Sequence, residues 1–226
     1  MIERDDVESV GGFQEGGRPR PAGLVWAWDV RVARYRDLVT GRFLSYRTIH
    51  DYVERSTQAS RAVVQYVTHQ YAEGVLTAQQ WARALWQEIK TEHIRQYLLG
   101  IGGVNQMDAS HWGRVGGILS DQWRYFKDFV QELPGLSEKQ IASRAQMYVS
   151  AAREAYERAN AIAQREAGME EELWVLGVAE HCDDCVAFAE MGWQPLGYFP
   201  MPGAGGTQCL TNCKCHKEYR KGGHEG

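Results

Sequence analysis

The residues of this sequence that could do chemistry are its five cysteines, which all lie near the C-terminus. They form a CxxC pair, Cys182 and Cys185, and a second group, Cys209, Cys213 and Cys215. A CxxC pair places two thiolates about one tight turn apart. A second group after a medium loop can then complete a tetrahedral site for Zn²⁺. The spacing therefore predicts a metal site in this stretch.

Five thiols compete for four tetrahedral positions, so the spacing leaves the ligand set open. The CxxC pair supplies the two most direct ligands. For the other two we favour Cys209 and Cys213, which are separated as two ligands on one turn of loop would be, with Cys215 nearly equal. His181 and His216 each adjoin a cysteine, but adjacent side chains point apart, so they rank below the thiols.

The surplus of thiols predicts a structural zinc rather than a catalytic one. A catalytic zinc needs an open position for water, a nearby carboxylate and a pocket that excludes solvent. Disulfides or free thiols are the main alternative reading. The sequence contains no HExxH, no GxSxG, no GxxxxGK[ST] and no zinc-deaminase signature. We therefore predict no catalytic residues and no enzyme, although chemistry in the helical part stays an alternative without a motif.

Composition sets the broad class. The chain has 226 residues, 44% hydrophobic and 24% charged, which is ordinary for a globular protein, and its net charge of −4 gives no global attraction for nucleic acid. No apolar run approaches the roughly 18 residues of a membrane span, and the N-terminus lacks the features of a signal peptide. We expect a cytosolic environment, in which clustered thiols favour metal over disulfide.

We expect three parts in a mainly α protein. Residues 1–23 are rich in Gly, Pro and charge and predict an extended arm that orders against a partner, with a disordered tail as the alternative. Residues 24–168 predict a helical body with long amphipathic helices. Residues 169–226 predict a small β and loop zinc-knuckle module with a basic tail. Its hydrophobic core is too small to keep the module folded without a cross-link such as a bound metal ion.

Apolar periodicity predicts four helices in the body, at 48–73, 77–100, 109–132 and 137–167. The second and fourth begin with Ser or Thr followed three residues later by Gln, the pattern of a capping box. The second helix is expected to end at Gly100. The fourth is expected to be a single long helix with a seam of small residues, against which another helix approaches closely.

Two features of the other helices allow specific predictions. The apolar face predicted for the first helix includes Ile49, Val53, Val63 and Tyr66, with a bend near Ser56 as one option. In the third helix, the pair Gly116-Gly117 predicts either a bend or the close approach of another helix.

The cysteine module contains two further segments of note. Leu173–Val178 is a short apolar run that predicts a strand. The Pro-rich loop between the cysteine groups contains Trp193, Tyr198 and Phe199, which we expect to fold over the metal as a miniature core, with a binding surface as the alternative. The basic residues of the tail are the candidates for phosphate contact, and a solvated tail is the favoured interpretation: Lys214, His216, Lys217, Arg220 and Lys221.

The order of these motifs resembles the cysteine-rich C-terminal module of tailed-phage minor head proteins, the Mu-type head morphogenesis family. The matching residues are Cys182-x2-Cys185, a Trp- and Pro-containing loop, Phe199-Pro200, Gly-Thr-Gln-Cys209 and Thr-Asn-Cys213-Lys-Cys215-x3-Tyr219. Weaker likenesses lie in the helical part at Tyr35-Arg-Asp-x3-Gly-Arg-Phe43, Trp81, Ile89-Lys90-x2-His93, Trp112-Gly-Arg-x-Gly116 and Arg144-Ala-x-Met-Tyr148. The family closes with a histidine where this chain has Cys209, so its ligand set does not carry over intact.

The resemblance implies a structural virion protein, a minor component of the head or head-tail junction that is assembled in the host cytoplasm. Its expected partners are other virion proteins, namely the portal, the major capsid protein or the connector, with several copies in each particle. No membrane partner is expected. The alternative is a nucleic-acid-binding or nucleic-acid-processing zinc protein that meets DNA through its basic tail.

Overall fold

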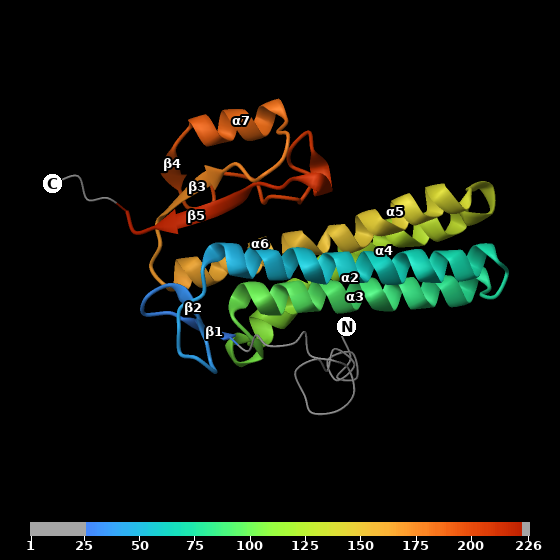
Figure 1. The fold of residues 1–226 in the computed structure, drawn as a ribbon, viewed down its shortest axis with the longest axis horizontal. Helices are drawn as coiled ribbons and strands as arrows, with labels where there is room; N and C mark the ends of the chain where they lie inside the picture. Colours follow the sequence, from blue (N-terminus) through green and yellow to red (C-terminus); the bar gives the residue numbers. More distant parts are fainter. Residues whose placement is uncertain (1–25, 223–226) are drawn as a thin grey trace.

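The computed structural model describes residues 26–222 and confirms a mainly helical protein with small strands near the two ends of the described chain (Figure 1). The helices are α2 (Tyr46–Ala72), α3 (Ala78–Ile101), α4 (Ala109–Glu132), α5 (Glu138–Ser150), α6 (Ala152–Glu166) and α7 (Asp183–Glu190). The strands are β1 (Trp26–Asp29), β2 (Arg34–Asp37), β3 (Glu171–Val175), β4 (Trp193–Pro195) and β5 (His216–Arg220). The predicted arm, 1–23, lies outside the described residues. None of the described helices combines the length and apolarity of a membrane span.

The predicted helix starts are confirmed where the capping chemistry is strongest. Thr77 and Gln80 form a reciprocal capping box at the start of α3, and Ser137 and Gln140 do the same for α5. In each, the hydroxyl oxygen accepts from a backbone N–H of the first turn while the Gln side chain accepts from the N-cap backbone N–H. These contacts satisfy donors that a helix N-terminus would otherwise leave unpaired.

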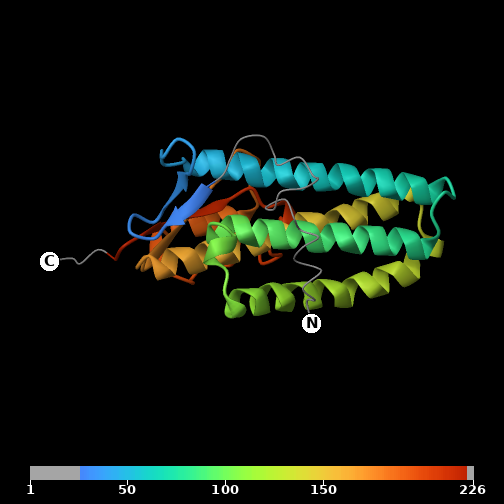
Figure 2. The ribbon, with the colours of Figure 1, turned by 90° about the horizontal axis from the view of Figure 1, so that it is seen from below.

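α3 occupies the centre of the helical body, between α2 and α4 (Figure 2), and it also packs along α6. The prediction that α3 ends at Gly100 is wrong, because the helix continues through Ile101 and Gly102 forms the left-handed C-cap. Gly100 instead permits a close helix crossing: a Cβ there would lie 2.3 Å from the Tyr156 carbonyl oxygen and 2.8 Å from the Ala159 Cβ. The expected close approach to the small-residue seam is thus found at α3.

α4 follows its predicted bounds, but Gly113 and Gly117 within it make no close approach to another element. A Cβ added at Gly117 would meet no atom within 4 Å beyond the neighbouring residues and the helix's own backbone. The helix also runs without interruption through this pair. The close approach predicted as one of two options for Gly116-Gly117 is therefore not found at Gly117.

The predicted single helix over 137–167 is interrupted at Ala151, which separates α5 from α6. The hydroxyl of Ser150 donates to the Gln146 carbonyl one turn earlier, at 2.6 Å, and accepts from Arg61 of α2. A serine that bonds back into its own helix competes with the regular ladder and bends the backbone. This interaction explains a break that the unbroken apolar seam does not reveal.

The buried face of α2 is the predicted one at Ile49 and Val53, but it differs from the prediction in the second half of the helix. Val63 and Tyr66 are 42% and 65% exposed, whereas Val64, Thr57 and Ser60 are buried. The polar residues turn inward because Glu92 of α3, fully buried, accepts hydrogen bonds there. Its donors are Ser56, Thr57, Ser60, Arg95 and Gln96. Burial raises the pKa of Glu92. Apolar periodicity cannot identify a helix face that pairs with a buried carboxylate.

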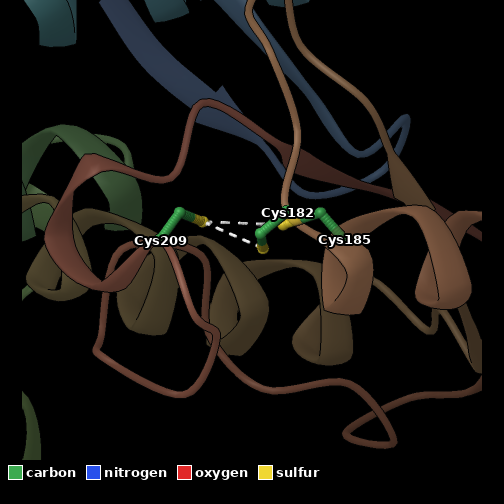
Figure 3. Close-up of side chains that lie close together, drawn as sticks. All are labelled: Cys182, Cys185 and Cys209. Carbon is green, nitrogen blue, oxygen red and sulfur yellow. Dashed lines mark hydrogen bonds between the residues drawn. The ribbon is translucent and has the colours of Figure 1, made fainter.

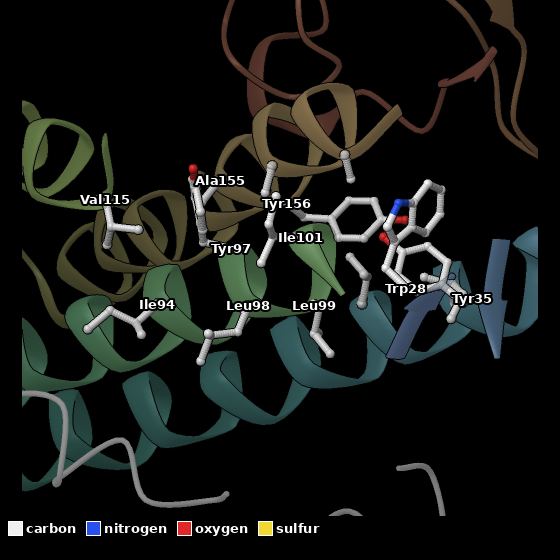
Figure 4. Packing of buried hydrophobic residues seen from close by; sticks show 14 of the residues in the cluster. Trp28, Tyr35, Ile94, Tyr97, Leu98, Leu99, Ile101, Val115, Ala155 and Tyr156 are labelled. Atoms are coloured by element: carbon white, nitrogen blue, oxygen red, sulfur yellow. The ribbon is translucent and has the colours of Figure 1, made fainter. Parts of the chain in front are cut away.

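A β-hairpin that the sequence patterns do not predict closes one end of the helical body. β1 and β2 pair antiparallel, with Trp28 opposite Tyr35. The Tyr35 hydroxyl donates to the Gly100 carbonyl at 2.6 Å, and Trp28 packs so closely on Gly102 that a Cβ there would lie 2.2 Å from its Cβ. The hairpin thus covers the C-terminal end of α3 (Figure 4).

The helical body holds two hydrophobic clusters. The first joins the hairpin to α2, α3, α4 and α6 (Figure 4) and comprises Trp28, Tyr35, Ile49, Val53, Ile94, Tyr97, Leu98, Leu99, Ile101, Val115, Leu119, Ala155, Tyr156, Ala159 and Ala163. The second comprises Val64, Trp81, Leu85, Ile89, Phe126, Phe129, Leu133, Ile141, Ala145 and Val149.

The C-terminal module lies on the α2 and α6 side of the body (Figure 1) and contains a three-stranded antiparallel sheet of order β4-β3-β5, with α7 packed on β3. Its buried core consists of Trp174, Phe199 and three of the cysteines. The expectation that the aromatic loop folds inward is met at Phe199, whose ring lies 6.0 Å from Trp174. It fails at Tyr198, which is 57% exposed.

Candidate metal centre

The first two cysteines are positioned by α7. Cys182 is its N-cap residue, and Cys185 lies in its first turn, so both sulfurs face the loop that bears Cys209 (Figure 3). The last two, Cys213 and Cys215, immediately precede β5, which pairs with β3. The start of α7 positions the first two cysteines, and the pairing of β5 with β3 positions the last two. Cysteines from both ends of the module are thus brought together.

Three separations between sulfur atoms match those expected in a tetrahedral thiolate site. Cys182 and Cys209 lie 3.6 Å apart, Cys185 and Cys209 3.7 Å, and Cys185 and Cys213 3.7 Å. Four sulfurs at the zinc–thiolate distance of about 2.3 Å in a tetrahedron would be about 3.8 Å from one another. All five cysteines are free thiols in the structure. A disulfide would need its sulfurs at about 2.05 Å. The donor set therefore fits a thiophilic metal ion.

The five thiols form two overlapping groups of three that share one member. Cys182, Cys185 and Cys209 form the first, and Cys185, Cys213 and Cys215 the second, with all sulfurs of each group within 4.8 Å of one another. Cys185 is the shared ligand candidate and is almost fully buried. Both triples could hold a metal ion, and the choice between Cys213 and Cys215 for the fourth position stays open on this geometry.

The two neighbouring histidines occupy different places. The His181 Nδ1 lies 3.6 Å from the Cys215 sulfur, and its Nε2 lies 2.9 Å from the Gly177 carbonyl. His216 points away from the thiols and stacks on Tyr46 of α2, with ring centroids 4.1 Å apart. Of the two, only His181 is placed beside the cysteine cluster.

Three local contacts fix the loops that bear the sulfurs. Gly177 passes so close to the second loop that a Cβ there would lie 2.0 Å from the Lys214 carbonyl oxygen. Asp184 of α7 accepts from the backbone N–H of Gln208 at 2.9 Å and from its side chain at 3.1 Å. The Thr207 hydroxyl lies 3.2 Å from the Cys209 sulfur. These contacts hold together the loops that bear the sulfurs.

The local environment favours thiolate character at one cysteine and opposes it at two others. Hydrogen bonds to the Cys182 sulfur, chiefly from the Cys185 backbone N–H, lower the pKa of that thiol to about 7. Burial raises the pKa of Cys185 and of Cys209. Buried thiols gain from a cation that removes their protons and neutralises their charge. A bound metal ion would supply that cation.

The predicted basic patch is largely neutralised by carboxylates. Lys214 contacts Glu54 of α2 at 2.8 Å, and Arg220 contacts Glu171 of β3 at 2.5 Å. Lys217 is fully buried and lies 3.1 Å from Glu172, also of β3. Three of the five residues proposed for phosphate contact are therefore held in ion pairs, and one of them is inaccessible to a polyanion.

Sequence reasoning missed one residue next to the site, Arg153 of α6. It is buried, and its guanidinium donates to the backbone carbonyls of Cys213 and Cys215, the latter at 2.6 Å. The available signal is an arginine within a small-residue seam, one turn before Glu157. An arginine at a seam position must be paired when buried.

The chain was compared with protein families, with curated proteins and with solved structures. No family model, no curated protein and no solved structure matches it. What can be inferred about its function therefore rests on its residues and their geometry.

Proposed function

We propose that this chain is a non-enzymatic structural protein of the head of a tailed phage or prophage, with a structural Zn²⁺ bound by its C-terminal cysteines. In this proposal Cys182, Cys185 and Cys209 supply three ligands, and Cys213, whose sulfur lies 3.7 Å from that of Cys185, supplies the fourth. Cys215 belongs with Cys185 and Cys213 to the second triple and lies 3.6 Å from the His181 Nδ1. The observation that carries the metal role is that three pairs of sulfurs, all involving Cys185 or Cys209, lie 3.6 to 3.7 Å apart, the separation expected between ligands of a tetrahedral thiolate site.

An all-thiolate site suits a structural ion. Four thiolates leave no open position for water, and Cys185 and Cys213 are both buried. Zinc is the proposed ion because sulfur ligands in tetrahedral geometry suit it and because it has no redox chemistry of its own. The ion would staple a module whose remaining buried core is two aromatic rings, Trp174 and Phe199.

The head role is supported by the sequence resemblance in the module and by the arrangement around it. The resemblance lies in Cys182-x2-Cys185 and in the closing Asn212-Cys213-Lys214-Cys215. The pairing of Lys214, Lys217 and Arg220 with carboxylates argues against the rival DNA-binding function. In this proposal the body and the module both present protein-binding surfaces to the portal, the major capsid protein or the connector.

Metal analysis of the purified protein tests the site. We expect one Zn²⁺ per chain by elemental mass spectrometry and five titratable thiols after denaturation in chelator. Cys213→Ser should lose the ion, whereas Cys215→Ser should retain it. A protein with two disulfides and no metal would sink the proposal, and equal retention by the two variants would reassign the fourth ligand.

A separate experiment tests the head role. We expect the tagged protein, co-expressed with the portal and capsid proteins of its own prophage, to copurify with assembled heads at several copies per particle. DNA binding that weakens steeply with salt and is lost on truncation after residue 213 would instead favour the nucleic-acid function. Absence from heads in which the other components assemble would overturn the proposal.

A further inference from the structure

Arg153 belongs to the helical body, but its guanidinium lies at the loop that bears two of the cysteines. It sits in the first turn of α6, just after the break at Ala151, and only 4% of the residue is exposed. Its two terminal nitrogens donate to the carbonyls of Cys213 and Cys215. The two carbonyls are two residues apart and are bridged by one planar group, which fixes the backbone of this loop.

The same guanidinium is held from the body side. Its Nη2 lies 3.4 Å from Glu157 Oε1 and 3.2 Å from His50 Nε2, and its Nη1 lies 3.9 Å from Glu54 Oε1. Glu54 also pairs with Lys214, the residue between the two bridged cysteines. Body and module therefore meet at Arg153 through groups of both parts.

Burying an arginine costs free energy unless hydrogen-bond acceptors and opposite charges surround its guanidinium. Without the docked module, Arg153 would lose both carbonyl acceptors and keep only its contacts within the body. Four thiolates around a divalent cation also leave a net negative site, which a nearby guanidinium stabilises. Metal binding and docking of the module thus favour each other through this one side chain.

We propose that Arg153 is a positioning residue that couples metal binding by the cysteines to docking of the C-terminal module on the helical body. The ion fixes the loop so that the carbonyls of Cys213 and Cys215 match the fork of the guanidinium. Arg153 in turn holds the loop in the geometry that the ligands require. This inference rests on the proposed metal site, and the coupling is reciprocal by thermodynamic necessity.

The test measures metal affinity in full-length variants by competition with a chelator. We expect Arg153→Ala to weaken Zn²⁺ binding about 10-fold to 100-fold, the range typical of lost outer-shell partners. Arg158→Ala is the matched control, because Arg158 lies on the same helix but is 51% exposed and pairs with Glu154. It should change the affinity less than twofold.

A spectroscopic readout separates positioning from general damage. Co²⁺ bound by the Arg153→Ala protein at saturation should show the absorption of a tetrahedral thiolate site, as in the wild type. Arg153→Lys, which retains the charge but not the bidentate fork, should give an intermediate affinity. Wild-type affinity in Arg153→Ala overturns the inference and leaves the metal site intact, whereas absence of metal binding in the wild type overturns the proposed function itself.

A measurement on the unaltered protein covers the case in which Arg153→Ala does not fold. Chelation of the metal should raise hydrogen exchange in β5 and in the first turn of α6, while the first half of α3 keeps its protection. Unchanged exchange at the first turn of α6 after complete metal removal would show that docking is independent of the metal, and the inference would be wrong.

Discussion

The helical body and the C-terminal module are stabilised in different ways. Among the described residues, the clusters of the body hold fifteen and ten buried apolar residues, whereas that of the module holds five, three of them cysteines. Large apolar burial stabilises the body by itself. A core as small as that of the module needs a staple. The chain thus contains one region built on packing and one built on its thiols.

Metal removal should give the largest effect, because it should destabilise the C-terminal module but not the helical body. Structural zinc sites contribute on the order of 10 kcal/mol to the folding of small domains. We expect a strong chelator to abolish amide protection in β3, β4 and β5 while α2 to α5 retain theirs, as measured by hydrogen exchange with mass spectrometry. Helical circular dichroism should fall only slightly, because α7 is the one α-helix of the module within the described chain. Equal loss in both regions would show that they form one cooperative unit.

The buried ion pair of the module should give the next largest effect. Lys217 donates to both oxygens of Glu172 and to the Phe199 carbonyl, and burial lowers the pKa of this lysine. Lys217→Met leaves the carboxylate buried without its partner, which costs about 3–5 kcal/mol. Urea unfolding followed by Trp fluorescence and by exchange in β5 measures this loss.

A second substitution provides the control for the ion pair. Adding Glu172→Gln to Lys217→Met removes the isolated charge, and the amide oxygen can still accept from the Phe199 backbone N–H, which now bonds to Glu172 at 2.7 Å. The double variant should therefore recover most of the stability that the single variant loses. If the double variant is the less stable of the two, the cost does not come from an uncompensated charge.

In the body, the strongest test of packing is Gly100→Ala. Its new methyl group would lie 2.3 Å from the Tyr156 carbonyl oxygen, so α3 and α6 must separate. We expect a loss of about 3 kcal/mol in the free energy of unfolding, at the upper end of overpacking costs. Gly117→Ala on α4 is the matched control, since its methyl group meets no atom within 4 Å. That variant should gain about 0.5–1 kcal/mol from helix propensity. Similar values for both would refute the close crossing.

The body was largely predictable because its signals are local. The capping boxes at Thr77 and Ser137 and the helix bounds of 109–132 needed only neighbouring residues. The inward polar face of α2 was not predictable, because it depends on Glu92, which comes from another helix. The break at Ala151 was not recognised, because the bond from Ser150 back to Gln146 leaves the apolar seam of the sequence unbroken. The hairpin was missed because four-residue strands carry little periodic signal.

For the candidate site, the sequence identified the residues but not their environment. The five cysteines were recognisable from their spacing, and two overlapping triples bring them together. The role of Arg153 and the pairing of Lys217 were not recognisable, because both depend on contacts between residues more than forty positions apart. A basic residue in a sequence pattern does not show whether its charge faces solvent or a buried carboxylate.

The smallest predicted effect is on the pH dependence of stability and comes from a buried histidine of the helical body. His93 of α3 is fully buried, and burial lowers its pKa to about 4 from an ordinary 6.5. Between these values the unfolded chain binds more protons than the folded one, so stability falls as the pH drops from 6.5 toward 4. At pH 5.5 this histidine should cost about 1.4 kcal/mol relative to pH 8. His93→Gln should remove that part of the pH dependence in urea titrations, whereas His69→Gln, at an exposed site on α2, should not. An unchanged pH slope in His93→Gln would mean that the histidine can be protonated in the folded protein, and that the core of the body is less dry than its packing indicates.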